Sequence, residues 1–166
     1  MLFTFTAGAA AWLCAVWPYR GTLRVPPHVE ANHVVKRILL WGAPSVALLS
    51  ALWRAGLDPV SATLLAAVPL LTILLVRRRQ LWVFALTGLA FFVPVYFAEL
   101  KLLFAILPDF PLQWSTGGAW TASFLGLPAG EPTWAAAFAI LWPVLIASAF
   151  EVEFKPTGTT AAASSV

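Results

Sequence analysis

Long apolar runs separated by short polar segments follow one another along most of the chain. The runs cover residues 1–19, 38–53, 60–76, 81–98 and 132–150. Each is close to the roughly 17–25 residues that a membrane-spanning helix needs. The pattern predicts an all-α fold, a polytopic membrane helix bundle with five transmembrane helices in a single domain over residues 1–155. The small and polar residues 156–166 predict a disordered tail.

Two of these runs have uncertain ends in the sequence pattern. The first lacks the basic start and the small-residue cleavage site of a signal peptide, so we expect it to stay in the mature protein as a helix. The fourth is followed by Glu99 and Lys101 and then by the apolar residues 102–107. That helix therefore either ends at residue 98 or continues to residue 107.

The composition agrees with a membrane protein and excludes several other classes. Apolar residues make up 61% of the chain and charged residues 10%, against about 45–50% and about 25% in soluble domains. A nucleic-acid-binding module, a secreted disulfide scaffold and an ordinary cytosolic enzyme are therefore excluded. Cys14 is the one cysteine, so no intramolecular disulfide framework exists. We expect the lipid bilayer as a partner and no nucleic acid.

The positions of the basic residues indicate how the bundle is oriented. With the N-terminus outside, eight of the ten Lys and Arg residues fall on the inside: Arg20, Arg24, Lys36, Arg37, Arg77, Arg78, Arg79 and Lys155. Short cytoplasmic loops carry an excess of Lys and Arg. The sequence therefore predicts an outside N-terminus and an inside C-terminus.

Four predicted helices each contain a proline, and these prolines allow two interpretations. Pro44, Pro69, Pro94 and Pro143 lie in different apolar runs. Proline is simply more frequent in membrane helices than in soluble ones. Alternatively, because proline removes a backbone donor and kinks a helix, these kinks open a cavity between helices for a lipophilic ligand.

Three of the seven acidic residues gather near the outer ends of the last two helices. These are Glu99, Asp109 and Glu131; we expect the remaining four, Glu30, Asp58, Glu151 and Glu153, to be solvated. Glu99 lies either among the headgroups or inside the apolar layer, where a carboxylate is costly and indicates function. Glu131 either stabilises the start of the last helix, where negative charge is favoured, or donates a proton from apolar surroundings that favour the neutral acid.

The only two histidines in the chain flank Glu30, as His28 and His33. Their spacing of five residues does not match the spacing of four that places two imidazoles on one helical face. An amphipathic segment at the membrane surface, running into Lys36 and Arg37, explains these residues better. We expect no metal site.

The stretch Gly-Leu-Pro-Ala-Gly-Glu at residues 126–131, with the apolar run 134–150 and Glu151 behind it, resembles the last third of the integral-membrane lycopene cyclase domain. In that family a Gly-rich stretch leads into a Leu-Pro-x-Glu-Glu motif and then an apolar helix. Glu99, at the end of the preceding helix, and the Trp/Gly-containing loop 114–118 match the family's layout. The chain departs from the motif at Gly130, which replaces the first Glu of the pair.

The resemblance implies a bacterial or archaeal cytoplasmic membrane and acid-initiated cyclisation, or binding, of a carotenoid or isoprenoid polyene. The activity would be that of an intramolecular lyase or isomerase without a cofactor. Glu131 would be the catalytic acid and Glu99 the base or second acid. The indoles of Trp114, Trp120 and Trp134 would bind the substrate and stabilise its cation through their π faces. Because the family often works as two such domains, the resemblance also implies a homo- or hetero-oligomer with another membrane protein.

A non-catalytic role is the alternative: a small subunit or structural component of a larger membrane complex. Its support is the scarcity of polar residues in the helices and the pair Ala135 and Ala139. Small residues four apart give a face on which helices pack closely in a membrane.

Overall fold

The computed structural model describes residues 2–109, 120 and 122–155. This part of the chain contains five α-helices: α1 (Leu2–Val16), α2 (Ala31–Arg54), α3 (Pro59–Arg77), α4 (Leu81–Ile106) and α6 (Gly130–Ala149). A 3-10 helix, η1 (Trp17–Tyr19), follows α1 directly. Two short antiparallel strand pairs complete the fold: β1 (Leu23–Arg24) with β4 (Glu153–Phe154), and β2 (Ser123–Phe124) with β3 (Leu127–Pro128).

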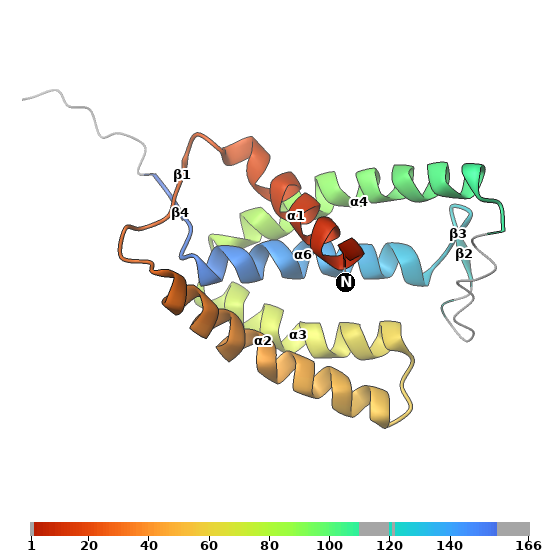
Figure 1. Ribbon diagram of the computed structural model, residues 1–166, viewed down its shortest axis with the longest axis horizontal. Coiled ribbons are helices and arrows are strands. Elements are labelled where there is room, and N and C mark those ends of the chain that lie inside the picture. The colour runs from red at the N-terminus through yellow and green to blue at the C-terminus, as the bar shows by residue number, and fades with distance from the viewer. Residues whose placement is uncertain (1, 110–119, 121, 156–166) are drawn as a thin grey trace, which may run out of the picture.

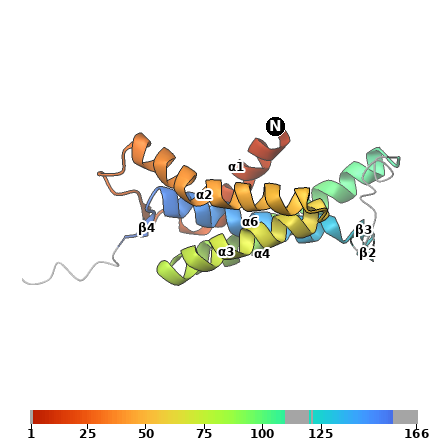
Figure 2. The ribbon, with the colours of Figure 1, turned by 90° about the horizontal axis from the view of Figure 1, so that it is seen from below.

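The last helix, α6, is the centre of the bundle. It contacts all four other α-helices, with α4 along one side and the α2–α3 hairpin along the other (Figure 1). The N-terminal end of α1 rises out of the layer formed by the other helices (Figure 2). The helix closest to the C-terminus is therefore the one around which the rest of the fold is arranged.

Four helices are long and apolar enough to cross a membrane, namely α2, α3, α4 and α6. They have 19 to 26 residues, or about 28–39 Å at 1.5 Å per residue, against about 30 Å of hydrocarbon core. This supports the prediction of an all-helical, multi-pass membrane protein. With 15 residues, α1 is only about 22 Å long, so the fifth span and the orientation stay predictions.

The pairing of α4 with α6 depends on small residues. A Cβ atom on Gly88 of α4 would overlap the backbone carbonyl oxygen of Ala139 on α6. Ala135 and Ala139 are fully buried. The close-packing face that the sequence predicts on α6 is therefore occupied within the chain by α4.

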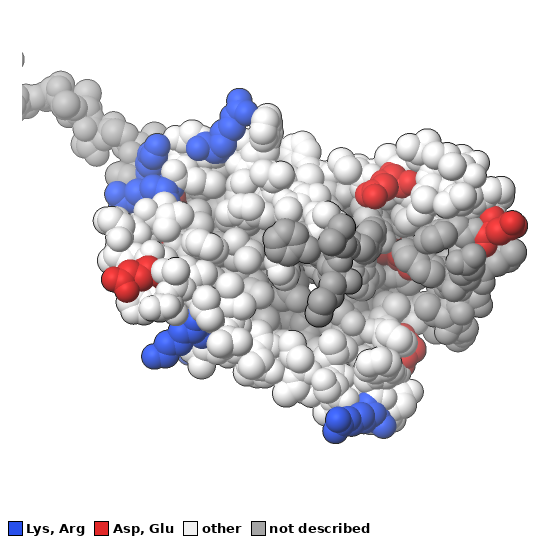
Figure 3. All heavy atoms as spheres, in the orientation of Figure 1, with Lys and Arg blue, Asp and Glu red and all other residues white. Residues whose placement is uncertain are grey.

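Charged residues separate to the two ends of the bundle. The β1–β4 pair aligns Leu23 with Phe154, so the ends of α1, α3 and α6 and the starts of α2 and α4 lie at the same end. All eight basic residues predicted to lie on one side of the membrane belong to segments at this end. On the face shown in Figure 3, most basic side chains gather there with an acidic group among them, and an uncharged belt separates them from the other end, where acidic side chains predominate and a further basic group lies.

The fourth helix continues past its charged residues and ends at Ile106, so Glu99 and Lys101 lie within α4. Beyond the helix, the β2–β3 hairpin packs back on α4: Phe124 contacts Phe97 edge-on at 6.3 Å between ring centroids. Leu127 of the hairpin is buried in the core that α1, α4 and α6 share. The predicted tail, 156–166, lies outside the described residues.

Candidate functional site

A hydrogen bond between Tyr96 and Glu131 joins α4 to the start of α6. The Tyr96 hydroxyl donates to Oε2 of Glu131 at 2.9 Å. Tyr96 is 3% exposed, and Glu131 is half-buried. Residue Ala129 occupies the N-cap position and no side chain caps α6, so Glu131 does not serve as a cap. Its carboxyl group lies in the first turn, where the helix dipole favours negative charge, but it bonds to the neighbouring helix.

Glu99 lies one helical turn beyond Tyr96 on α4 and is exposed. It is about 27 Å along the helix from Leu81, near the boundary of a hydrocarbon core about 30 Å thick. Tyr96 interacts electrostatically with both Glu99 and Glu131. Within the described residues the two carboxyl groups form no direct hydrogen bond, and of the two only Glu131 is hydrogen-bonded to Tyr96.

Aromatic rings continue inward from the Tyr96–Glu131 pair. Trp134 stacks on Phe138 at 4.9 Å between ring centroids, and Phe138 stacks on Trp142 at 5.7 Å. Tyr96 contacts Trp134 at 5.9 Å and Phe92 at 5.8 Å. We call these five residues the aromatic row. Their π faces provide an environment that stabilises positive charge without offering a nucleophile.

The three predicted substrate-binding tryptophans have different surroundings. Trp134 belongs to the aromatic row and contacts Tyr96, as a site residue should. Trp120 instead donates from Nε1 to Oγ of Ser61 at 3.0 Å and packs near Gly130, which ties the start of α6 to α3. Trp114 lies outside the described residues.

A lipid-facing groove runs between α1 and α4 and leads to Tyr96 and Glu99. It consists of two adjacent cavities that share Val95. The first, about 340 Å³, is lined by Leu13, Cys14, Trp17, Pro18, Phe91 and Val95. The second, about 230 Å³, is lined by Thr6, Ala7, Ala10, Phe92, Val95, Tyr96 and Glu99. Ligand pockets commonly measure about 300–1,000 Å³.

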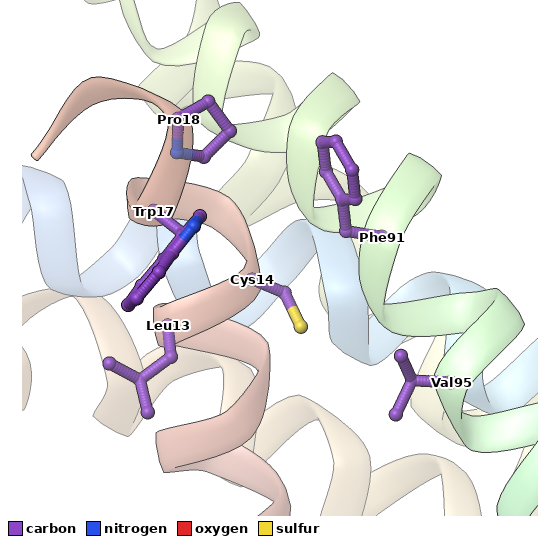
Figure 4. A pocket seen from close by; sticks show the side chains of 6 residues that line it. All are labelled: Leu13, Cys14, Trp17, Pro18, Phe91 and Val95. Carbon is purple, nitrogen blue, oxygen red and sulfur yellow. The ribbon is translucent and has the colours of Figure 1, made fainter.

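The wall of this α1–α4 groove is open towards the membrane. Figure 4 shows the Cys14 sulfur pointing from α1 into the space towards Phe91 and Val95 on α4. Leu13, Phe91 and Val95 are each more than half exposed. A hydrophobic ligand could therefore enter the groove sideways from lipid, without passing through water.

A second polar cluster lies at the β1–β4 end, around Glu151. This carboxylate pairs with Arg37 at 2.5 Å and hydrogen-bonds to Nε2 of His28 at 2.8 Å. The hydrogen bonds from His28 and Arg37 lower the pKa of Glu151 below its usual range. The expectation that Glu151 is merely solvated is wrong, because the residue joins the loop before α2, α2 itself and the end of α6.

Asp58 also differs from its expected solvated role. Its side chain accepts a hydrogen bond from the backbone N–H of Ser61 at 2.9 Å and caps the start of α3. Hydrogen bonds to Ser61 lower the pKa of Asp58. Asp58 is therefore a structural residue of the short turn between α2 and α3.

Tyr96 and Phe138 are the site residues that sequence reasoning missed. Tyr96 precedes Glu99 by three residues, which places both on one face of a helix, and this spacing was a usable signal. Nothing local indicated that its hydroxyl bonds a residue 35 positions away.

Comparison with known proteins identifies no relative. A scan against protein-family models gives no match, and searches of curated proteins and of solved structures find no similar protein. The resemblance to lycopene cyclase domains therefore stays a prediction. Function is argued below from the site itself.

Proposed function

We propose that the chain binds the end of a long apolar polyene and cyclises it by acid–base chemistry, as a lycopene cyclase-like intramolecular lyase or isomerase. The observation that carries this proposal is the Tyr96–Glu131 hydrogen bond, set between an aromatic row and a lipid-facing groove. A carboxyl group held by a buried tyrosine beside π faces suits proton transfer to a weakly basic carbon–carbon double bond.

The groove determines how the substrate is bound. Its outer cavity is almost entirely apolar, whereas the inner one ends at Tyr96 and Glu99. A linear polyene would lie along α1 and α4 with one end at the two polar residues. The rest of the polyene would stay in contact with lipid, which suits a substrate too long for an enclosed cavity.

The first step is protonation. Neutral Glu131 transfers its proton to the terminal double bond, whose π electrons form the new C–H bond and leave a tertiary carbocation. Tyr96 donates to Oε2 throughout and stabilises the carboxylate that forms. Within the described residues Oε1 has no hydrogen-bond partner, and Glu131 is linked to the groove by its bond to Tyr96, which lines the inner cavity.

Ring closure and proton loss complete the reaction. The π electrons of a second double bond attack the cation, form the ring bond and move the positive charge onto a ring carbon near the aromatic row. Glu99 accepts a proton from that ring, and the C–H electrons restore a double bond. Glu99, which is exposed, then releases that proton to solvent, and Glu131 takes up a new proton from solvent before the next turnover. The product is an isomer of the substrate, so no co-reactant is consumed.

The orientation and the fifth span belong to the same proposal. Eight of the ten basic residues belong to the β1–β4 end, which supports a cytoplasmic position for that end. Helix α1, which is shorter than the hydrocarbon core, then crosses where the bilayer thins around it, and Tyr96, Glu99 and Glu131 lie near the outer face of a bacterial or archaeal cytoplasmic membrane. The carotenoid or isoprenoid would reach them from the outer leaflet.

A lycopene-accumulating host tests this function. Expression of the chain, alone and with a second copy fused to it, should convert linear lycopene into a cyclic product. Glu131→Gln should abolish conversion at unchanged membrane expression. The matched control is Glu30→Gln, the same change at an exposed acid on the opposite end, which should convert normally. Lycopene as the sole product from both arrangements would refute the proposal.

The alternative of a non-catalytic subunit loses one of its two supports. Ala135 and Ala139 pack against α4 and are not available to a partner helix. An oligomer, if it forms, would use other surfaces. The hydrogen-bonded carboxyl group of Glu131 is also unexplained by a purely packing role.

A further inference from the structure

Two cavities at the basic end of the bundle meet at Trp41. One is polar, about 530 Å³, and its lining includes His28, Arg77 and Arg78. The other is apolar, about 270 Å³, and lies between α2 and α3. Trp41 lines both. We propose that together they form a binding site for an anionic phospholipid, with the phosphate in the polar cavity and an acyl chain in the α2–α3 groove.

The polar cavity favours an anion beside Arg77 and Arg78. Glu151 is paired with Arg37, and Glu153, the other acid in the lining, is paired with Arg24 at 3.2 Å. These carboxylates are therefore already neutralised by partners. The two guanidinium groups of Arg77 and Arg78 are different, because among the described residues neither forms an ion pair.

Within the described part of the chain, each of the two arginines makes one close contact, which leaves further N–H donors free. The Arg77 guanidinium lies over the Trp41 ring at 5.2 Å. Arg78 donates from Nη2 to the carbonyl oxygen of Val152 at 3.2 Å and is half-buried, and this burial lowers its pKa. Glu151 and Glu153 attract Arg78 electrostatically, but each is already paired with another arginine, and a partly desolvated guanidinium is costly. A phosphate, which arginine binds through parallel N–H donors, would offset that cost.

The apolar part of the site is shaped by two prolines. Pro44 of α2 and Pro69 of α3 both line the groove, together with Leu40, Leu48 and Ile73. Proline cannot make the regular helical hydrogen bond and clashes with the preceding turn. That both prolines line this cavity is in keeping with the cavity-opening interpretation of the helix prolines.

The site lies at the depth in the membrane where a phospholipid of the surrounding leaflet has its headgroup. Arg77 and Arg78 end α3, at the charged end of the bundle. Tryptophan is enriched at the headgroup level of membranes, and Trp41 lies where the polar cavity changes to the apolar one. A lipid seated here would therefore have its phosphate at the level of the other headgroups.

Thermal unfolding of the full chain in a neutral detergent tests this site. Short-chain phosphatidylglycerol should raise the melting temperature in a saturable way, whereas phosphatidylcholine and inorganic phosphate should not. Arg77→Gln with Arg78→Gln should weaken the apparent affinity about tenfold or more, since charge-assisted hydrogen bonds are lost. The matched control is Arg79→Gln, the exposed neighbour outside the cavity lining.

A second variant separates binding from folding. Ser45→Phe fills the α2–α3 groove and leaves every charge in place, so it should weaken phosphatidylglycerol binding several-fold even if the double arginine variant is unstable. Equal stabilisation by phosphatidylcholine would refute the charge recognition. Equal stabilisation by inorganic phosphate would refute the lipid and indicate an ion site. Loss of affinity in Arg79→Gln as large as in the double variant would refute the cavity.

Discussion

Replacing Tyr96 by Phe removes a single hydroxyl group and leaves the ring in place. The ring contacts with Phe92 and Trp134 are kept, so the change isolates the 2.9 Å hydrogen bond to Glu131. A typical hydrogen bond contributes about 0.5–1.5 kcal/mol, and one to a charged group about 1.5–3 kcal/mol. Between membrane helices the measured average is about 0.6 kcal/mol with a maximum near 1.7 kcal/mol.

We therefore expect Tyr96→Phe to lower the free energy of unfolding by about 0.6–1.7 kcal/mol. Turnover should fall about tenfold, because a hydroxyl that stabilises the forming carboxylate by about 1.4 kcal/mol changes a rate by that factor. Stability would be measured by equilibrium unfolding of the full chain in mixed micelles.

A double-mutant cycle shows whether the loss comes from this pair. In Tyr96→Phe with Glu131→Gln the second change should cost less than it does alone, with a coupling of about 0.5 kcal/mol or more. Tyr19→Phe is the control, since Tyr19 is the other tyrosine of the chain and packs at the opposite end. Additive single effects, or an equal loss in Tyr19→Phe, would refute the assigned hydrogen bond.

Three further predictions follow from other parts of the fold. Gly88→Ala should lower the free energy of unfolding by about 1–3 kcal/mol through overpacking against α6. The control Gly42→Ala adds its methyl group to open space and should cause no such loss. Equal unfolding midpoints for the two variants would contradict the α4–α6 packing. Folding lowers the pKa of Glu151, so the stability that this carboxylate contributes is present above about pH 4.3 and is lost as the pH falls further. Glu151→Gln should therefore flatten the acidic part of a plot of melting temperature against pH. An unchanged slope would argue against the pairing of Glu151 with His28 and Arg37. With the native cysteine replaced by alanine, Arg54→Cys should react with an impermeant maleimide in intact cells and Arg79→Cys only after lysis, and the reverse pattern would overturn the orientation.

The helices were predictable because apolar length alone nearly determines them in a membrane. The main differences are at the ends: α2 begins at Ala31, not at residue 38, because its first two turns are polar and extend beyond the apolar run. The α4 ending at Ile106 was one of two alternatives that hydropathy could not separate, since one charge pair does not stop a helix.

The candidate site was predictable only in part. Glu131 was singled out by its position before an apolar helix, but its partner depends on how α4 packs against α6. The same limit applies to Glu151, whose partners His28 and Arg37 are more than 100 positions away. Long-range pairing follows from tertiary packing, and hydrophobic periodicity carries no information about it.

Incorporation of solvent deuterium tests the proposed acid–base cyclisation most directly. Membranes containing the full chain are transferred to D₂O and supplied with linear lycopene, and the product is analysed by mass spectrometry. Because Glu131 exchanges its proton with solvent before each turnover, the cyclic product should gain one deuterium per ring while unreacted lycopene gains none. A cyclic product without deuterium, or no cyclic product at all, would contradict the account.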